Sequence, residues 1–244
     1  MDRIELKLAA KARVQGHRWT LLKANIVVGV IAYGANMILS NIFPLIFGGT
    51  ALISQEPGVL VTSFITTYIM TLLISTAVSA PLQMGIVMYY NQFDEEDFAD
   101  INIIFHPYKY FVKVFVITIF INVLVGVGTL FLIVPGIILS FAFAIIPYVY
   151  MKHPELGVMD MVSTAWRMMR GHKMDYFILS LSFLGWILLG VATCGVLLIW
   201  LIPYQTMTYV RFFNEIDKEY FKDEYQSEEI IETEVEVEEN NNEE

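Results

Sequence analysis

Val114–Met151 reads VFVITIFINVLVGVGTLFLIVPGIILSFAFAIIPYVYM, a run of 38 residues without a charged side chain. A helix rises about 1.5 Å per residue, so a single rod of this length would measure about 57 Å, nearly twice the hydrocarbon thickness of about 30 Å. Gly126, Gly128, Pro135 and Gly136 lie near its middle, and these are residues that favour turns and end helices. The run therefore predicts two membrane helices joined by a tight turn.

Three other stretches, residues 24–55, 57–93 and 176–210, also lack charged side chains. The whole chain is 56% hydrophobic and only 16% charged, whereas a soluble chain is roughly 45–50% apolar and about 25% charged. We predict an all-α, polytopic transmembrane helical bundle of about six spans, in a membrane domain covering residues 24–214. The spans form three hairpins, at about 24–90, 114–151 and 176–212, and the second span continues past Pro81 with a kink.

The basic residues support this number of spans. All fifteen Lys and Arg residues fall before span one, between spans two and three, between four and five, or after six. The positive-inside rule then places both termini in the cytoplasm and the chain in the cell membrane as a multi-pass protein. An aromatic belt is expected at the cytoplasmic ends, formed by Tyr89, Tyr90, Tyr108, Tyr110, Tyr148, Tyr150 and Tyr176.

Two segments outside the spans read as interfacial amphipathic helices. In residues 154–170, one face carries apolar side chains, namely Met161, Val162, Ala165, Trp166, Met168 and Met169. The alternative is that this face packs under the bundle. Residues 1–23 form the second interfacial helix, in which the basic residues Arg3, Lys7, Lys11 and Arg18 align on one side. Each hairpin follows a basic, aromatic lead segment, which indicates three degenerate repeats; both hairpin duplication and a transporter fold would produce such repeats.

Basic and aromatic residues of these two segments are candidates for contact with anionic phospholipid in the bilayer. They are Arg13, Arg18, Trp19, Lys23, Trp166, Arg167, Arg170 and Lys173. The alternative is that their positive charge only sets the topology.

The C-terminal segment, residues 215–244, carries 14 acidic residues against two lysines, while the remaining 214 residues have a net charge of +2. High charge and low apolar content predict a largely disordered tail. It could compete with anionic lipid for the basic segments, dock a basic protein partner, or act as a plain solvating tail.

No arrangement of residues indicates catalysis. The four histidines form no metal-binding motif, and Cys194 is the single cysteine. Asp94–Asp97 with Asp100 read as a solvated loop rather than a divalent-cation site. We therefore predict a non-enzymatic protein with no catalytic, cofactor-binding or metal-binding residues and no nucleic-acid partner.

Several elements resemble a bacterial integral-membrane family, domain of unknown function 975. They are Leu132–Ile138, Pro147-Tyr148, Ser163–Lys173, Leu181–Trp186 and Trp200–Tyr204, together with Ala12–Trp19 at the start. The resemblance covers roughly residues 5–214, but His17 and His172 stand where the family has Asn. It implies the fold and carries no known activity. We expect a module that organises, senses or protects the membrane, including protection from membrane-active peptides; the alternative is a small-molecule or lipid transporter.

Overall fold

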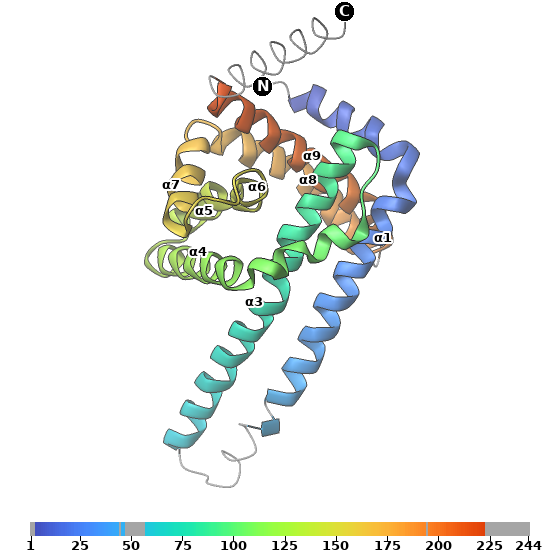
Figure 1. Ribbon diagram of the computed structural model, residues 1–244. Coiled ribbons are helices and arrows are strands. Elements are labelled where there is room, and N and C mark those ends of the chain that lie inside the picture. The colour runs from blue at the N-terminus through green and yellow to red at the C-terminus, as the bar shows by residue number, and fades with distance from the viewer. Residues whose placement is uncertain (1–2, 44, 47–56, 194, 223–244) are drawn as a thin grey trace, which may run out of the picture.

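The computed structural model describes residues 3–43, 45–46, 57–193 and 195–222, and these residues form a bundle of helices (Figure 1). The elements are α1 (Arg3–Phe43), α3 (Pro57–Glu96), the 3-10 helix η2 (Ile101–Tyr110), α4 (Phe111–Phe131), α5 (Ile133–Phe143), α6 (Ile146–Lys152), α7 (Val158–Met168), α8 (Lys173–Ala192) and α9 (Val196–Tyr220). Six helical segments are long and apolar enough to cross a membrane. The predicted all-α fold with about six candidate spans is confirmed.

The predicted turns of the second and third hairpins are present. Leu132 alone connects α4 to α5, in an extended conformation with φ −157° and ψ 135°. Gly195 precedes α9 with φ +88°, a conformation that glycine adopts at little cost because it has no Cβ. Cys194 lies outside the described residues. The turn-forming residues in these two charge-free runs therefore predicted correctly that each run forms two helices, α4 with α5 and α8 with α9.

The two long helices of the first hairpin differ from the prediction in where they bend or break. α3 continues through Pro81 as one helix, whereas the break lies in α1, where His17 has φ −127° and ψ 25°. Gly16 precedes this break and is a weak helix former. Figure 1 shows the two parts of α1 meeting at an angle. The N-terminal helix therefore ends at this break rather than at residue 23.

The part of α1 before His17 packs along α9. Leu6, Ala10 and Val14 recur every four residues, and all three are buried. After the break, the ring of Trp19 lies 5.9 Å from that of Trp200, which is near the start of α9. A stack of parallel hairpins would place these two rings at opposite ends of the bundle. The N-terminal part of α1 instead runs beside α9 in the opposite direction.

The amphipathic helix α7 covers residues 158–168, shorter than the predicted 154–170. Pro154 lies in the turn before the helix, and Gly157 is the N-cap residue. Met161, Ala165 and Met168 are buried, so this face packs on the bundle as the alternative interpretation held. Trp166 is 41% exposed. The apolar face is thus divided between the protein core and the surface.

The tyrosine belt was predicted wrongly for four of its seven members. Tyr89, Tyr90, Tyr148 and Tyr150 are buried in the core, where aromatic rings pack together; Tyr148, for example, lies 4.8 Å from Phe213 between ring centroids. α9 also continues to Tyr220, so the first residues of the predicted tail are helical and packed. Residues 223–244 lie outside the described residues.

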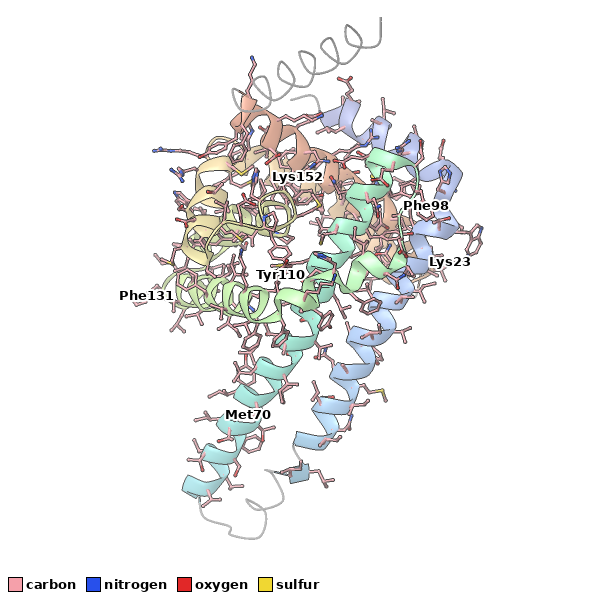
Figure 2. All side chains as sticks on the ribbon, viewed as in Figure 1. Lys23, Met70, Phe98, Tyr110, Phe131 and Lys152 are labelled. Atoms are coloured by element: carbon pink, nitrogen blue, oxygen red, sulfur yellow. The ribbon has the colours of Figure 1, made fainter. Side chains whose placement is uncertain are left out.

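Polar and apolar side chains separate along the molecule. Figure 2 shows mostly carbon on the lower parts of α1 and α3, around Met70, where the sequence has no charged residue, while nitrogen and oxygen atoms gather in the upper body around Lys152. α4 runs across the direction of these lower parts, toward Phe131 (Figure 2). We call the upper body the polar end. η2 begins beside the last turns of α3, where the backbone N–H of Asp100 donates to Oε1 of Gln92 at 3.4 Å. The Asp100 carboxylate accepts a 3.0 Å hydrogen bond from the backbone N–H of Asn102, which holds the pKa of that carboxyl below its ordinary value.

Candidate functional site

The polar end contains a carboxylate held by two arginines from different helices. Arg211 of α9 donates from Nε and Nη2 to Oδ1 of Asp94 at 3.0 and 2.7 Å. Arg13 of α1 approaches the same oxygen at 3.5 Å and also pairs with Asp97. The Asp94 side chain is only 13% exposed. The prediction of a solvated loop was therefore wrong for Asp94, because its position in the last turns of α3 brings it between α1 and α9.

Further polar pairs surround this carboxylate. Lys152 of α6 pairs with Glu95 at 2.8 Å, and Nε2 of His153 lies 3.4 Å from Asp217. Asn214 of α9 donates to Asn91 of α3 at 2.8 Å. These contacts join α3, α6 and α9 in addition to the α1 contact through Arg13.

A hollow of about 720 Å³ opens among these groups. Its charged lining comprises five carboxylates and four cations, namely Glu5, Asp94, Glu95, Glu215, Asp217, Lys152, Arg211, Lys218 and Lys222. We call it the charge-balanced hollow. Among the described residues, no group of three or more His, Cys, Asp or Glu side chains is arranged to hold a metal ion. Because its five carboxylates and four cations nearly neutralise one another, the hollow does not favour the transporter alternative for an ionic solute.

A second hollow has a different chemistry. It measures about 380 Å³ and lies between the first part of α1 and the α8–α9 hairpin. Its lining is Lys11, Val14, Arg18, Trp186, Leu197, Trp200, Leu201 and Tyr204. We call it the α1–α9 groove. It combines two cations with aromatic and aliphatic side chains, and its lining includes no carboxylate.

The α1 face that borders the groove is basic along its length. Lys7, Lys11 and Arg18 share this face at helical spacing. Lys7 donates to Ser182 and lies 4.6 Å from the centroid of the Phe183 ring. The Arg18 guanidinium lies 5.7 Å from the centroid of the Trp200 ring, a cation–π distance. The basic alignment read from the sequence thus faces α8 and α9.

A third region, on α7 and the start of α8, is basic and exposed. Nζ of Lys173 lies 3.4 Å from the centroid of the Trp166 ring, and Arg167 contacts Ser163 at 3.5 Å. Arg167 and Arg170 are exposed. We call Trp166, Arg167, Arg170 and Lys173 the α7–α8 corner. An apolar hollow of about 530 Å³ lies beside it, lined by residues of α4, α5 and α7 that include Trp166 and Arg167.

The eight residues predicted from the sequence to contact anionic lipid lie at separate places in the structure. Arg13 pairs with the carboxylates of Asp94 and Asp97 at the polar end, so the protein itself compensates its charge. Arg18 and Trp19 lie at the α1–α9 groove, and Lys23 is exposed one helical turn further along α1. The remaining four, Trp166, Arg167, Arg170 and Lys173, form the α7–α8 corner.

The sequence aligned Lys11 with Arg18 on one side of the N-terminal helix, but it did not place Trp186, Trp200 and Tyr204 beside them. The alignment of the two cations was readable because Lys11 lies seven residues before Arg18, which is a helical spacing. Trp186 and Trp200 gave no such signal in the sequence, because their closeness to α1 depends on how the first and last helices pack.

The family model described as Protein of unknown function (DUF975) matches residues 123–220, from the second half of α4 to the end of α9. Residues 123–220 are thus similar to a domain of unknown function, and we call them the DUF975 segment. No curated protein and no solved structure matches the chain. The DUF975 segment supplies the α8 and α9 walls of the groove and the whole α7–α8 corner, while Lys11 and Arg18 come from α1, outside the match. The DUF975 segment and the apolar helices together indicate a membrane protein.

Proposed function

We propose that this chain is a non-enzymatic, multi-pass membrane protein whose α7–α8 corner binds the headgroups of anionic lipids. The observation that carries the proposal is the exposure of Arg167 and Arg170, neither of which has a carboxylate partner within the described part of the chain. Positive charge that the protein leaves uncompensated attracts an anionic leaflet by about 1 kcal/mol per basic residue.

The surroundings of the corner support a membrane contact rather than a purely aqueous surface. Trp166 is 41% exposed beside the cations, and Met159 nearby is 65% exposed. Tryptophan is enriched at the level of lipid headgroups because its ring is apolar and its N–H is polar. The buried face of α7 fixes the helix on the bundle, which holds these side chains at a constant depth.

The proposal assigns the corner and both termini to the cytoplasmic face of the cell membrane, because the basic residues gather in the segments between the hairpins. Within this proposal, the protein organises, senses or protects the membrane, and protection from membrane-active peptides is one form of that role. The acidic segment that follows α9 competes with lipid for the basic surface.

The test compares lipids retained by the purified protein. The full chain is extracted in a mild detergent, and phosphatidylglycerol and phosphatidylcholine are quantified in the bound lipid. We expect phosphatidylglycerol to be enriched in the wild type, and less so in Arg167→Gln with Arg170→Gln.

Lys218→Gln with Lys222→Gln is the matched control, since it removes the same charge from the charge-balanced hollow. Equal enrichment in the wild type and both double variants at low salt would reject the corner as a lipid-binding surface.

A further inference from the structure

The α1–α9 groove is a built hollow rather than a shallow surface. Val14 of α1 and Leu201 of α9 form its buried floor, being 4% and 6% exposed. Trp186 and Trp200 stand at its sides, 53% and 43% exposed. The groove therefore has a closed apolar base and aromatic walls that reach its mouth.

The cations of the groove differ from their neighbours on the same helix. Lys7 is engaged with Ser182 and Phe183, and Arg13 with Asp94 and Asp97. Lys11 and Arg18, in contrast, have no carboxylate partner among the residues that the structure describes, and the Arg18 guanidinium lies over the ring of Trp200. Two positive charges thus stand at the groove without an anion from the described residues.

Tryptophans gather at the same place. Trp186 and Trp200 line the groove, and the ring of Trp19 lies 5.9 Å from that of Trp200. These are three of the four tryptophans in the chain. Such clustering is typical of the boundary between headgroups and acyl chains. A ligand here would meet cations on the α1 side and apolar surface on the α8–α9 side.

We propose that the α1–α9 groove binds one anionic phospholipid, with its phosphate between Lys11 and Arg18 and an acyl chain along Trp186, Leu197 and Leu201. The lipid supplies the two parts that the groove lacks, an anion for the cations and an aliphatic chain for the open apolar wall. This site deepens the proposed function and rests on it for the class of lipid. It does not use the α7–α8 corner.

The test is native mass spectrometry of the full chain in detergent, titrated with dimyristoyl phosphatidylglycerol. The wild type is expected to bind a first lipid more tightly than later ones, and more tightly than dimyristoyl phosphatidylcholine. Lys11→Gln with Arg18→Gln is expected to weaken this first binding about 30-fold, which corresponds to about 1 kcal/mol for each cation. Leu197→Trp, which fills the groove and keeps both cations, is expected to weaken it as well.

The controls separate this site from the proposed function. Arg167→Gln with Arg170→Gln is expected to keep the first bound lipid, since those residues lie outside the groove. If the groove variants bind the first lipid as tightly as the wild type does, the groove assignment is overturned. The proposed role of the α7–α8 corner is tested separately, and it stands if the corner variant retains less phosphatidylglycerol than the wild type. Competition by inorganic phosphate alone would overturn the lipid assignment in favour of a simple anion site. A wild-type dimer that becomes a monomer in Leu197→Trp would assign the groove to a second copy of the chain and overturn it too.

Discussion

Two hollows lie on either side of the first part of α1, and lysine and arginine side chains line both, but these cations have different partners in each. At the charge-balanced hollow, the lining residue Asp94 pairs with Arg211 and also with Arg13 of α1, so the protein provides its own counter-charge. In the α1–α9 groove, Lys11 and Arg18 lie beside aromatic rings, and the lining provides no carboxylate. The difference teaches that a basic residue near a membrane surface is a lipid-binding candidate only where the fold leaves its charge uncompensated.

The largest expected effect comes from removing the shared carboxylate. Asp94→Ala leaves Arg13 and Arg211 partly buried without their partner, and we expect a loss of about 3 kcal/mol in the free energy of unfolding. A fall in thermal midpoint in detergent measures this loss. Asp97→Asn is the control, because the Asp97 side chain is 64% exposed, where an ion pair is worth about 1 kcal/mol or less, and because asparagine tolerates the left-handed conformation of residue 97, with φ +61°. Equal losses in the two variants would remove the distinction between the hollows.

A substitution without charge provides the next comparison. A Cβ at Gly85 of α3 would overlap the backbone carbonyl of Ile104 in η2. Gly85→Ala is therefore expected to cost about 2 kcal/mol, because backbone atoms must move to relieve the overlap. The thermal midpoint is again the measure, and Gly58→Ala, where a Cβ meets open space, is the control. An unchanged midpoint in Gly85→Ala would contradict the close packing of η2 on α3.

The groove cations are expected to behave in the opposite way to Asp94. Lys11→Gln with Arg18→Gln should change stability by no more than about 0.5 kcal/mol in a zwitterionic detergent, since both side chains are exposed. Phosphatidylglycerol should then stabilise the wild type, by roughly 1 kcal/mol at a few times its Kd, and stabilise the variant less. Thermal midpoints with and without the lipid decide this. A variant that unfolds much earlier without lipid would show that these cations are structural after all.

The smallest effect concerns the acidic segment. Residues 223–244 carry eleven acidic and no basic residues. A chain ending at Lys222 is expected to bind phosphatidylglycerol a few-fold more tightly at low salt, and the gain should shrink at high salt because screening weakens long-range charge effects. The native mass spectrometry titration measures it. Equal affinity of the two chains at low salt would leave the segment without a role in lipid competition.

Local patterns in the sequence were sufficient for the helices and their turns. Charge-free runs and the residues around Leu132 and Gly195 located the second and third hairpins, because hydropathy and turn chemistry depend on neighbouring residues. The basic face of α1 was also readable from its spacing. What faces it was not, because the pairing of α1 with α9 depends on packing between segments about 200 residues apart. Asp94 was misread for the same reason, since its two arginines lie on α1 and α9.

The packing of α1 against α9 also has a consequence for biosynthesis. The ribosome makes α1 first and α9 last among the described helices, so Leu6, Ala10 and Val14 wait for their partner while the other helices emerge. An unfinished chain would carry this apolar stripe uncovered, and Asp94 would lack its partner Arg211. The contact between α1 and α9 therefore forms only after α9 has been made. A protease or chaperone that recognises the uncovered stripe would distinguish copies without α9 from copies that have it.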